Sequence, residues 1–307
     1  MLRFILRRLA GAVPTLFIIV TVAFFMIRIA PGGPFDIERP LNPDIIANLN
    51  RVYHLDEPLW RQYLRYLWSL LQGDLGPSFS RRDFSVNDLF RVGLPVSLQI
   101  GGTAILIALV LGTALGTLAA LRQNTWVDYL VVGTATVGIT VPTFVIAPLL
   151  SLVFGVWMGW LPAGGWSGTD WRYMVLPVAT LALPQMAVIA RMIRGATIEA
   201  LRSHHVRTAR AYGLPRRVVL FTHTLRAAIL PVVSYLGPTA ALLLTGSVVV
   251  ETIFGIPGIG RYFVQGALGR DYTLVMGTVV VIALFVVVLN LLVDVLYALL
   301  DPRVRYD

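Results

Sequence analysis

Six long apolar runs are the feature that most constrains the fold of this 307-residue chain. An α-helix rises about 1.5 Å per residue, so about 20 apolar residues cross a hydrocarbon core about 30 Å thick. Backbone polar groups in lipid must be satisfied within the segment, which favours helices for runs of this length. The sequence therefore predicts an all-α multispanning membrane protein with six transmembrane helices. The expected spans are Leu9–Ala30, Val96–Leu121, Tyr129–Trp157, Met174–Ile193, Ile229–Ile253 and Leu274–Leu300.

Charge placement gives these spans an orientation. All 25 basic residues are arginine, and the formal net charge is +9. Fourteen arginines and only four acids fall on the side that holds both chain ends, whereas eleven of each fall on the other side. An excess of arginine on one side of a membrane is the positive-inside signature, so we expect both termini to be cytoplasmic. Orientation accounts for the positive charge, and binding of nucleic acid has no remaining support.

Absent residue types and motifs exclude several kinds of chemistry. The chain has no cysteine, which excludes disulfides, thiolate nucleophiles and cysteine-based zinc sites. It has no lysine, so it lacks the phosphate-binding loop G-x-x-x-x-G-K-[ST] and that kind of ATP site. The motifs H-E-x-x-H and G-x-S-x-G are also absent, so an intramembrane enzyme lacks a catalytic set. His204 and His205 predict a solvated pair rather than a metal site, and we expect no catalytic residue, metal or cofactor in this chain.

An ion-driven secondary transporter is a second alternative. Such proteins usually show repeated halves, broken helices near the midplane and acids within the membrane. Here no internal repeat is apparent, and acids are scarce within the expected spans: Asp294 lies inside the last span, and Glu251 lies at the outer end of the fifth. We therefore expect Asp294 to make a structural hydrogen bond or ion pair with a neighbouring helix.

Residues 31–94 are polar enough to lie outside the membrane, on the side opposite the termini. Asn42 is a cap for one short helix, and Pro58 begins another. The second helix carries apolar residues at helical spacing up to Gly73, which predicts an amphipathic helix on the outer membrane surface. At the end of the first span, the Arg28 side chain is expected to extend to the same interface.

The longest polar interval on the cytoplasmic side between two spans runs from Arg191 to Arg226 and contains eight arginines and one acid. Its first half has apolar residues at helical spacing, and Gly213 is expected to end that helix. A proline two residues later is preorganised for the start of the next helix. The pattern predicts helix, glycine elbow and helix, a shape suited to docking in a groove of a partner; the alternative is a solvated basic loop. The expected apolar stripe consists of Ile198, Leu201, Ala209 and Tyr212.

Two stretches of this interval resemble a known family. Arg207–Pro215 reads RTARAYGLP, and His223–Pro231 reads HTLRAAILP. They resemble the cytoplasmic EAA loop of binding-protein-dependent ABC import permeases, and more narrowly the peptide and nickel branch of that family. Within this branch the chain looks most like the B-type permease subunit of oligopeptide importers. Four further segments carry the resemblance across almost the whole chain: Gly73–Phe79, Glu251–Gly260, Arg270–Tyr272 and Asp294–Arg303.

The resemblance implies a type I ABC importer permease fold and the import of oligopeptides across the bacterial inner membrane. The implied partners are a second homologous permease, two cytoplasmic ATPase subunits that bind ATP and Mg, and an extracytoplasmic solute-binding protein. Importers of dipeptides, nickel complexes or glutathione share this architecture and are alternatives. Residues 1–94 would form an N-terminal transmembrane helix with an extracytoplasmic segment, and residues 95–307 a five-helix permease core that contains a coupling loop over 191–228.

The same resemblance assigns the basic interval as the loop that couples the permease to an ATPase. Gly213 stands at the family glycine. Arg207, Thr208 and Ala209 replace the general Glu-Ala-Ala, and Tyr212 stands where the peptide branch often has lysine. The residues expected to take part in coupling are Glu199, Arg202, Arg207, Thr208, Ala209, Arg210, Gly213, Leu214 and Pro215.

Other positions carry narrower expectations. Gly112 and Gly116 form a small-xxx-small face in the second span, where another helix can approach closely. Pro142 and Pro148 permit kinks in the third span. The candidates for an outer gate or a structural role are Glu251, Pro257, Gly258 and Asp294.

Overall fold

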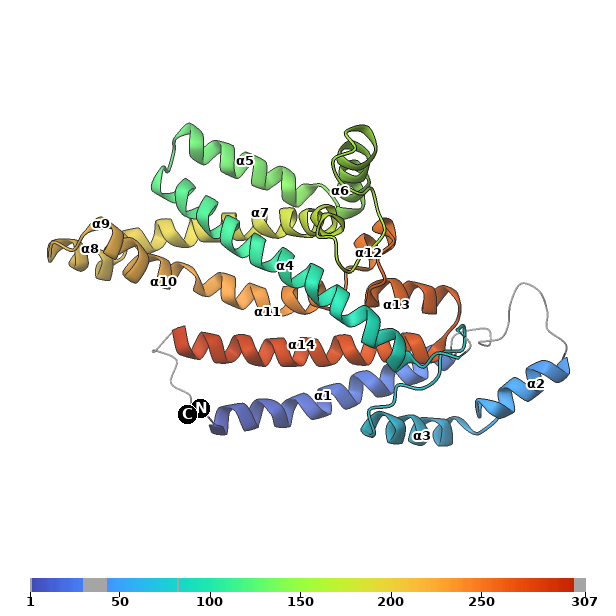
Figure 1. The fold of residues 1–307 in the computed structure, drawn as a ribbon. Helices are drawn as coiled ribbons and strands as arrows, with labels where there is room; N and C mark the ends of the chain where they lie inside the picture. Colours follow the sequence, from blue (N-terminus) through green and yellow to red (C-terminus); the bar gives the residue numbers. More distant parts are fainter. Residues whose placement is uncertain (1, 30–42, 82, 301–307) are drawn as a thin grey trace.

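The computed structural model describes residues 2–29, 43–81 and 83–300. Within these ranges every element of secondary structure longer than a single β-bridge is a helix. The long helices pack side by side in a bundle (Figure 1). Five helices are long and apolar enough to cross a membrane, and a bent pair makes a sixth when it is counted as one span. The prediction of an all-α multispanning protein is confirmed. The five are α1 (Leu2–Ile29), α4 (Val86–Leu121), α7 (Arg172–Arg202), α11 (Leu230–Leu244) continued by α12 (Val248–Phe254), and α14 (Tyr272–Leu300).

The bent pair occupies the third expected span. It consists of α5 (Trp126–Thr140) and α6 (Thr143–Leu150), extended by the π-helical segment η1 (Ser151–Trp157), and it bends by 101°. Pro142 lies in the break. It has no N–H to donate, and it disfavours helical geometry at Val141, whose φ and ψ are −78° and 120°. The break falls at one of the prolines expected to permit a kink, but the size of the bend means that the run is not one continuous helix.

The most extensive contact in the bundle is the crossing of α4 and α7. Glycines of α4 make it possible. A Cβ atom added at Gly116 would lie 2.4 Å from the carbonyl oxygen of Ala190, and one added at Gly112 would lie 2.9 Å from the Ile189 side chain. Because neither position has room for a side chain, the two backbones approach more closely than larger residues would allow.

Two short helices lie outside the bundle, as the sequence predicts for the segment before Gly73. They are α2 (Pro43–Val52) and α3 (Leu59–Leu71); Asn42, the expected cap of the first, lies outside the described residues. Tyr63 and Tyr66 of α3 pack on Phe24 of α1, with ring centroids 5.2 and 5.8 Å apart. The other apolar side of α3 is exposed and consists of Trp60, Leu64, Trp68 and Leu71.

The Arg28 side chain packs against its own helix and bonds to α3. Its guanidinium carbon lies 3.8 Å from the centre of the Phe24 ring, and its Nε donates to Oε1 of Gln62 at 2.9 Å. Gln62 in turn donates from Nε2 to the carbonyls of Leu55 and Glu57. The arginine lies against Phe24 of its own helix, and α3 supplies the amide acceptor that bends its side chain toward α3.

The bundle has two distinct ends (Figure 1). The helices α8 (His204–Ala211) and α9 (Arg216–Val218) lie at one end, with the first residues of α1 and the last residues of α14. The helices α12 and α13 (Ile259–Leu268) lie toward the opposite end. The basic interval therefore lies on the same side as both described ends of the chain.

Replacing Gly116 by alanine tests the α4–α7 crossing. The added methyl group must displace the α7 backbone, so we expect a loss of about 1–3 kcal/mol of stability. Gly133→Ala in α5 is the matched control, because a Cβ added there meets nothing within 4 Å. Thermal unfolding of both variants in detergent checks the difference, and equal unfolding temperatures would contradict this account of the crossing.

Candidate functional site

The basic interval forms helical pieces around two breaks. α7 continues beyond the expected span as far as Arg202. Ser203 then adopts extended geometry, with φ −69° and ψ 157°, before α8 begins. The prediction of one helix from Ile198 to Gly213 is therefore wrong, since the chain is divided at Ser203. After Gly213 the chain continues through α9, η2 (Val219–Thr224) and α10 (Leu225–Ala228) into α11.

Gly213 ends α8 in a left-handed turn. Its φ is +74°, and an added Cβ would meet nothing within 4 Å, so glycine is favoured by the backbone conformation and not by lack of space. The amide of Gly213 donates to the carbonyl of Arg210 at 3.0 Å, and the amide of Leu214 donates to the carbonyl of Ala209 at 3.3 Å. These bonds form a Schellman motif. Pro215, with φ −56°, then starts α9. We call residues 213–215 the elbow.

A small apolar cluster joins the two arms of the elbow. Val206 and Ala209 of α8 pack against Val219 of η2, and all three side chains are buried. Tyr212 lies outside this cluster and is 83% exposed. Its expected place in the apolar stripe is wrong, because the turn at Ser203 changes which residues of α8 face the bundle.

The exposed surface of the elbow and of the residues on either side of it combines apolar and cationic groups. Among the predicted coupling residues, Ala209 is buried and the others are exposed. Exposed apolar residues grouped on a polar surface mark a contact surface for another macromolecule. The apolar members, which we call the elbow face, are Tyr212, Leu214, Val218 and Phe221. The exposed predicted coupling residues are Glu199, Arg202, Arg207, Thr208, Arg210, Gly213, Leu214 and Pro215.

An ion pair joins α5 to α7, in the part of α7 that precedes the elbow. The Asp128 carboxylate accepts hydrogen bonds from Nε and Nη2 of Arg194 at 2.5 and 2.7 Å, and from the amide of Asn124 at 3.0 Å. The Asp128 side chain is only 1% exposed. Arg202 adds a longer bond to Gln123, at 3.4 Å. A displacement of the last turns of α7 therefore acts directly on the turn between α4 and α5.

Toward the opposite end of the bundle, Glu251 organises the turn between α12 and α13. Its buried side chain accepts hydrogen bonds from the Ser97 hydroxyl at 2.7 Å and from the Arg261 amide at 3.0 Å. A Cβ atom added at Gly258 would lie 2.2 Å from the Glu251 carboxyl carbon. The turn, which also contains Pro257, is thus wrapped around the carboxylate. This geometry ties α4, α12 and α13 together and favours the structural role of Glu251 over the gate.

Asp271 joins two distant segments that both carry the family resemblance. Its Oδ2 accepts from the Ser78 hydroxyl at 2.5 Å and from the Ser80 amide at 3.1 Å, while Oδ1 accepts from the Leu274 amide at 3.1 Å. Burial raises the pKa of the Asp271 carboxyl, but the hydrogen bonds from Ser78, Ser80 and Leu274 outweigh burial, so the pKa lies below its ordinary value. The charged carboxylate therefore fastens the segment after α3 to the start of α14.

Asp294 forms an ion pair with Arg8 of α1, with Oδ2 and Nη1 3.1 Å apart. A second contact joins Nη2 of Arg8 to Oδ1 at 3.3 Å. The pair links the first and last spans near the end of the bundle where α8 lies. Asp301 and Arg303, from the same family segment, lie outside the described residues.

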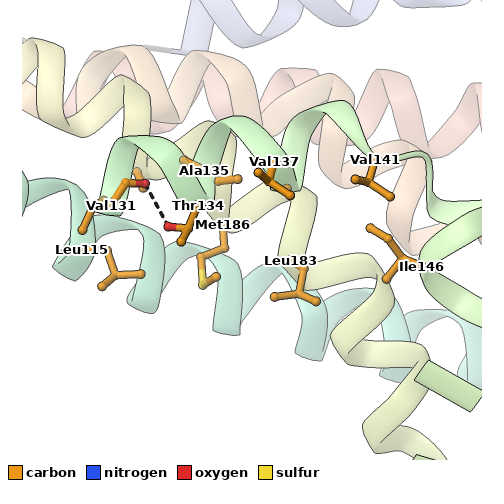
Figure 2. Close-up of a pocket in the computed structure, with 12 residues that line it drawn as sticks. Leu115, Val131, Thr134, Ala135, Val137, Val141, Ile146, Leu183 and Met186 are labelled. Atoms are coloured by element: carbon orange, nitrogen blue, oxygen red, sulfur yellow. Dashed lines mark hydrogen bonds between the residues drawn. The ribbon is translucent and has the colours of Figure 1, made fainter. Parts of the chain in front are cut away.

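A cavity of about 280 Å³ lies between α5 and α7. Figure 2 shows the side chains that line it. Its lining is almost entirely apolar. The hydroxyl of Thr134 is its one polar side-chain group, and it donates to the backbone carbonyls of Leu130 and Val131. The cavity has no free side-chain donor or acceptor for a polar solute, so it does not have the properties of a peptide-binding site.

Three polar contacts of the site were not predicted, namely those of Asp128, Ser97 and Asp271. Asp128 and Asp271 stand at the starts of apolar runs, and Ser97 stands inside one. From these positions one can predict that the three side chains need hydrogen-bond partners, but not which residues those partners are. Those partners lie 66 to 193 residues away in the sequence. The identity of each partner therefore depends on the fold.

Comparison with known proteins places the chain among transporter components. Residues 112–306 match the family described as binding-protein-dependent transport system inner membrane component, and residues 1–83 match the N-terminal family of such membrane components. The chain is 50% identical, over 306 residues and the full length of both proteins, to the oligopeptide transport system permease proteins OppB of Salmonella typhimurium and Escherichia coli. It is 43% identical over 305 residues to the dipeptide transport system permease protein DppB of Bacillus subtilis, covering 99% of this chain and 98% of that protein.

A solved structure supports the fold. The crystal structure of an amino acid ABC transporter with histidines matches with a TM-score of 0.50 at 20% identity, and the match covers 71% of this chain and 95% of the other. At this level of identity the likeness concerns the fold alone.

Acidification should weaken the Asp271 contact. The pKa of this carboxyl is lower in the folded protein than in the unfolded chain, so its stabilising contribution is complete above the unfolded value, about 3.9, and is lost as the pH falls through the folded value. We expect Asp271→Asn to lower the unfolding temperature at pH 7 and to reduce the further loss on acidification. Asp56→Asn, at an exposed acid, is the control. If the unfolding temperatures of the wild type and of Asp271→Asn fell in parallel as the pH is lowered, this role of Asp271 would be contradicted.

Glu251→Gln should destabilise the turn between α12 and α13. The amide can present only one oxygen, and the Ser97 hydroxyl already accepts from the Ile259 amide at 3.0 Å, so one buried donor loses its acceptor. The expected cost is about 1–3 kcal/mol. Unfolding in detergent is compared with that of Glu199→Gln, which makes the same change at an exposed site. Equal stability of the two variants would remove the structural role assigned to Glu251.

Proposed function

Because the chain belongs to the family of binding-protein-dependent transport system inner membrane components, we propose that it is the permease subunit of an ATP-driven importer of oligopeptides. Full-length relatives at 50% identity are oligopeptide permeases, which supports this substrate class. A dipeptide permease at 43% identity keeps dipeptides as the nearest alternative. Nickel complexes and glutathione are more distant alternatives with the same architecture.

The observation that carries the coupling proposal is the elbow. Its left-handed glycine joins two helical arms, and exposed arginines flank its exposed apolar residues in the sequence. An apolar face gives binding energy once a groove covers it, and the surrounding charges orient the approach. We propose that this surface docks on a cytoplasmic ATPase subunit, and that two such partners bind ATP and Mg and hydrolyse the nucleotide. The chain itself supplies no catalytic group in this proposal.

Movement of the docked elbow would reach the membrane through α7. This helix is continuous from Arg172 to Arg202, and the ion pair between Asp128 and Arg194 links it to α5. A rigid element that contacts two moving parts transmits a displacement, whereas a flexible loop absorbs it. The ion pair therefore allows closure of the ATPases to move α5 and α7 together.

The remaining partners follow from the same proposal. One permease chain would form half of a translocation path, so a second homologous permease completes it, and a solute-binding protein delivers the peptide on the outer side. In this arrangement residues 1–94 form the peripheral span and outer segment, and residues 95–307 form the five-span core. Both termini then lie in the cytoplasm with the elbow.

Uptake by the reconstituted transporter tests the substrate class. Vesicles that contain this chain, its partner permease and both ATPases should take up labelled oligopeptides in the presence of ATP and the binding protein. Excess dipeptide should compete poorly. Preferential uptake of dipeptides would replace oligopeptides by the nearest alternative, and ion-driven uptake by the isolated chain would overturn the ATP-driven mechanism.

Gly213→Val tests the elbow. A β-branched residue strongly disfavours φ +74°, so the turn should open and transport should fall at least about tenfold, while insertion into the membrane is retained. Gly159→Val is a matched control, because Gly159 also has a positive φ (+63°) and an added Cβ meets nothing within 4 Å, yet it lies in the turn after η1 at a distance from the elbow. ATP hydrolysis stimulated by loaded binding protein is the second readout. Normal stimulation in Gly213→Val would count against coupling through the elbow.

A further inference from the structure

A second cavity, of about 180 Å³, lies where the end of α1 meets α3 and the segment that follows α3. Its lining includes Arg28, Arg65 and Tyr66 together with Gln62 and Ser69. It is separate from the elbow and from the apolar cavity beside α5. Unlike that apolar cavity, it brings several hydrogen-bond donors together in one place.

Arg28 is the principal charge of this cavity. Its Nε is bonded to Gln62, but no acidic side chain in the described parts of the chain forms an ion pair with its guanidinium. The guanidinium is half-buried over the Phe24 ring and so has lost part of its hydration. A half-buried cation that lines a cavity favours an anion in that cavity.

Tyr66 provides a second donor. Its hydroxyl is buried and has no hydrogen-bond partner in the structure, a costly arrangement for a polar group. Burial raises the pKa of the Tyr66 phenol, despite an opposing effect of Arg28, so the hydroxyl keeps its proton at neutral pH. Because Tyr66 and Arg28 both line the cavity, an anion bound there can offer an acceptor oxygen to each of them.

The charge around the cavity is positive. Arg65 and His54 also line it, whereas no carboxylate does. The nearest acid that contacts these residues is Glu57, which pairs with Arg65 at 2.7 Å and with the His54 ring at 3.4 Å. Glu57 therefore offsets the charge of Arg65, and among the described residues no carboxylate pairs with Arg28.

The position of α3 sets the level of the cavity in the membrane. Trp60, Leu64, Trp68 and Leu71 form an exposed apolar stripe along this helix, which is too short to span a bilayer. Such a helix lies in the interface with its apolar side in the acyl region. Arg28 is in the last turn of the first span, so the cavity opens at the depth of lipid headgroups.

We propose that this cavity binds the phosphate group of an anionic lipid headgroup through Arg28 and the Tyr66 hydroxyl. The site is independent of the proposed transport function. Its ligand would fasten α3 to α1 by accepting a hydrogen bond from the Tyr66 hydroxyl of α3 and by pairing with the Arg28 guanidinium of α1, which has no acidic partner among the described residues.

Lipid-dependent stability of the full-length chain tests this proposal. The protein is placed in nanodiscs of phosphatidylcholine with increasing phosphatidylglycerol, and retained lipids are counted by native mass spectrometry. We expect the wild-type unfolding temperature to rise with phosphatidylglycerol. Tyr66→Phe and Arg28→Gln should each weaken the response at least about tenfold in lipid concentration. Arg61→Gln, the same charge change at an exposed arginine of α3, should keep it.

Tyr66→Phe separates lipid binding from a purely structural role. It removes a buried hydroxyl without a partner, so its stability in pure phosphatidylcholine should equal or exceed that of the wild type. Inorganic phosphate is added to phosphatidylcholine nanodiscs in a parallel series; a shift that the same variants lose supports the site and identifies free phosphate as a second ligand. An equal phosphatidylglycerol response in all variants, or none in the wild type, would overturn the proposal. Asp36 and Glu38 follow the first span in the sequence and lie outside the described residues. A phosphatidylglycerol response that arises only after these two acids are neutralised would also overturn the proposal, because an acid of this chain would then be the occupant.

Discussion

The close approach of α4 and α7 at Gly112 and Gly116 is the contact on which the rest of the structure depends. Lipid tails are as apolar as leucine, so helices in a bilayer gain little from hiding apolar surface from one another and associate through dense packing of their backbones. The crossing fixes α7, and α7 holds the other elements in place. It is bonded to α5 through Arg194 and to α11 through Gln185, which accepts from the Tyr235 hydroxyl. A change at either end of α7 therefore reaches most of the bundle.

Buried carboxylates fix the ends of this packed body. Asp128, Glu251 and Asp271 lie close to the ends of helices, and each accepts hydrogen bonds from elements other than its own. A buried charge is costly unless its acceptor positions are used, so each carboxylate holds its donors firmly in place. Close packing holds the long helices together, and these carboxylates add polar bonds between elements near the helix ends. These acids act as joints between elements, and their geometry offers no relay of the kind that ion-driven transport needs.

The parts of the fold that depend on local chemistry could be predicted from the sequence, and the parts that depend on distant partners could not. Hydropathy located the spans because the bilayer imposes one length on all of them, and the Gly213-Leu214-Pro215 order located the elbow. The 101° bend was not predicted, since Pro142 permits a kink without setting its size. The break at Ser203 was missed for a similar reason: residues on both sides of it fit one helical period. The inward turn of Arg28 depends on an acceptor that α3 supplies.

The elbow also shows why charge alone is an incomplete description of the basic interval. A solvated loop that only satisfies the positive-inside rule needs arginines but has no use for a grouped apolar surface. Here the buried cluster consists of one alanine and two valines, whereas the exposed elbow face includes a tyrosine, a leucine and a phenylalanine. The segment thus exposes larger apolar groups than it buries, which is unfavourable for a free-standing element in water. A partner that covers Tyr212 and Phe221 would remove this cost, and the left-handed turn at Gly213 lies between these two residues in the chain.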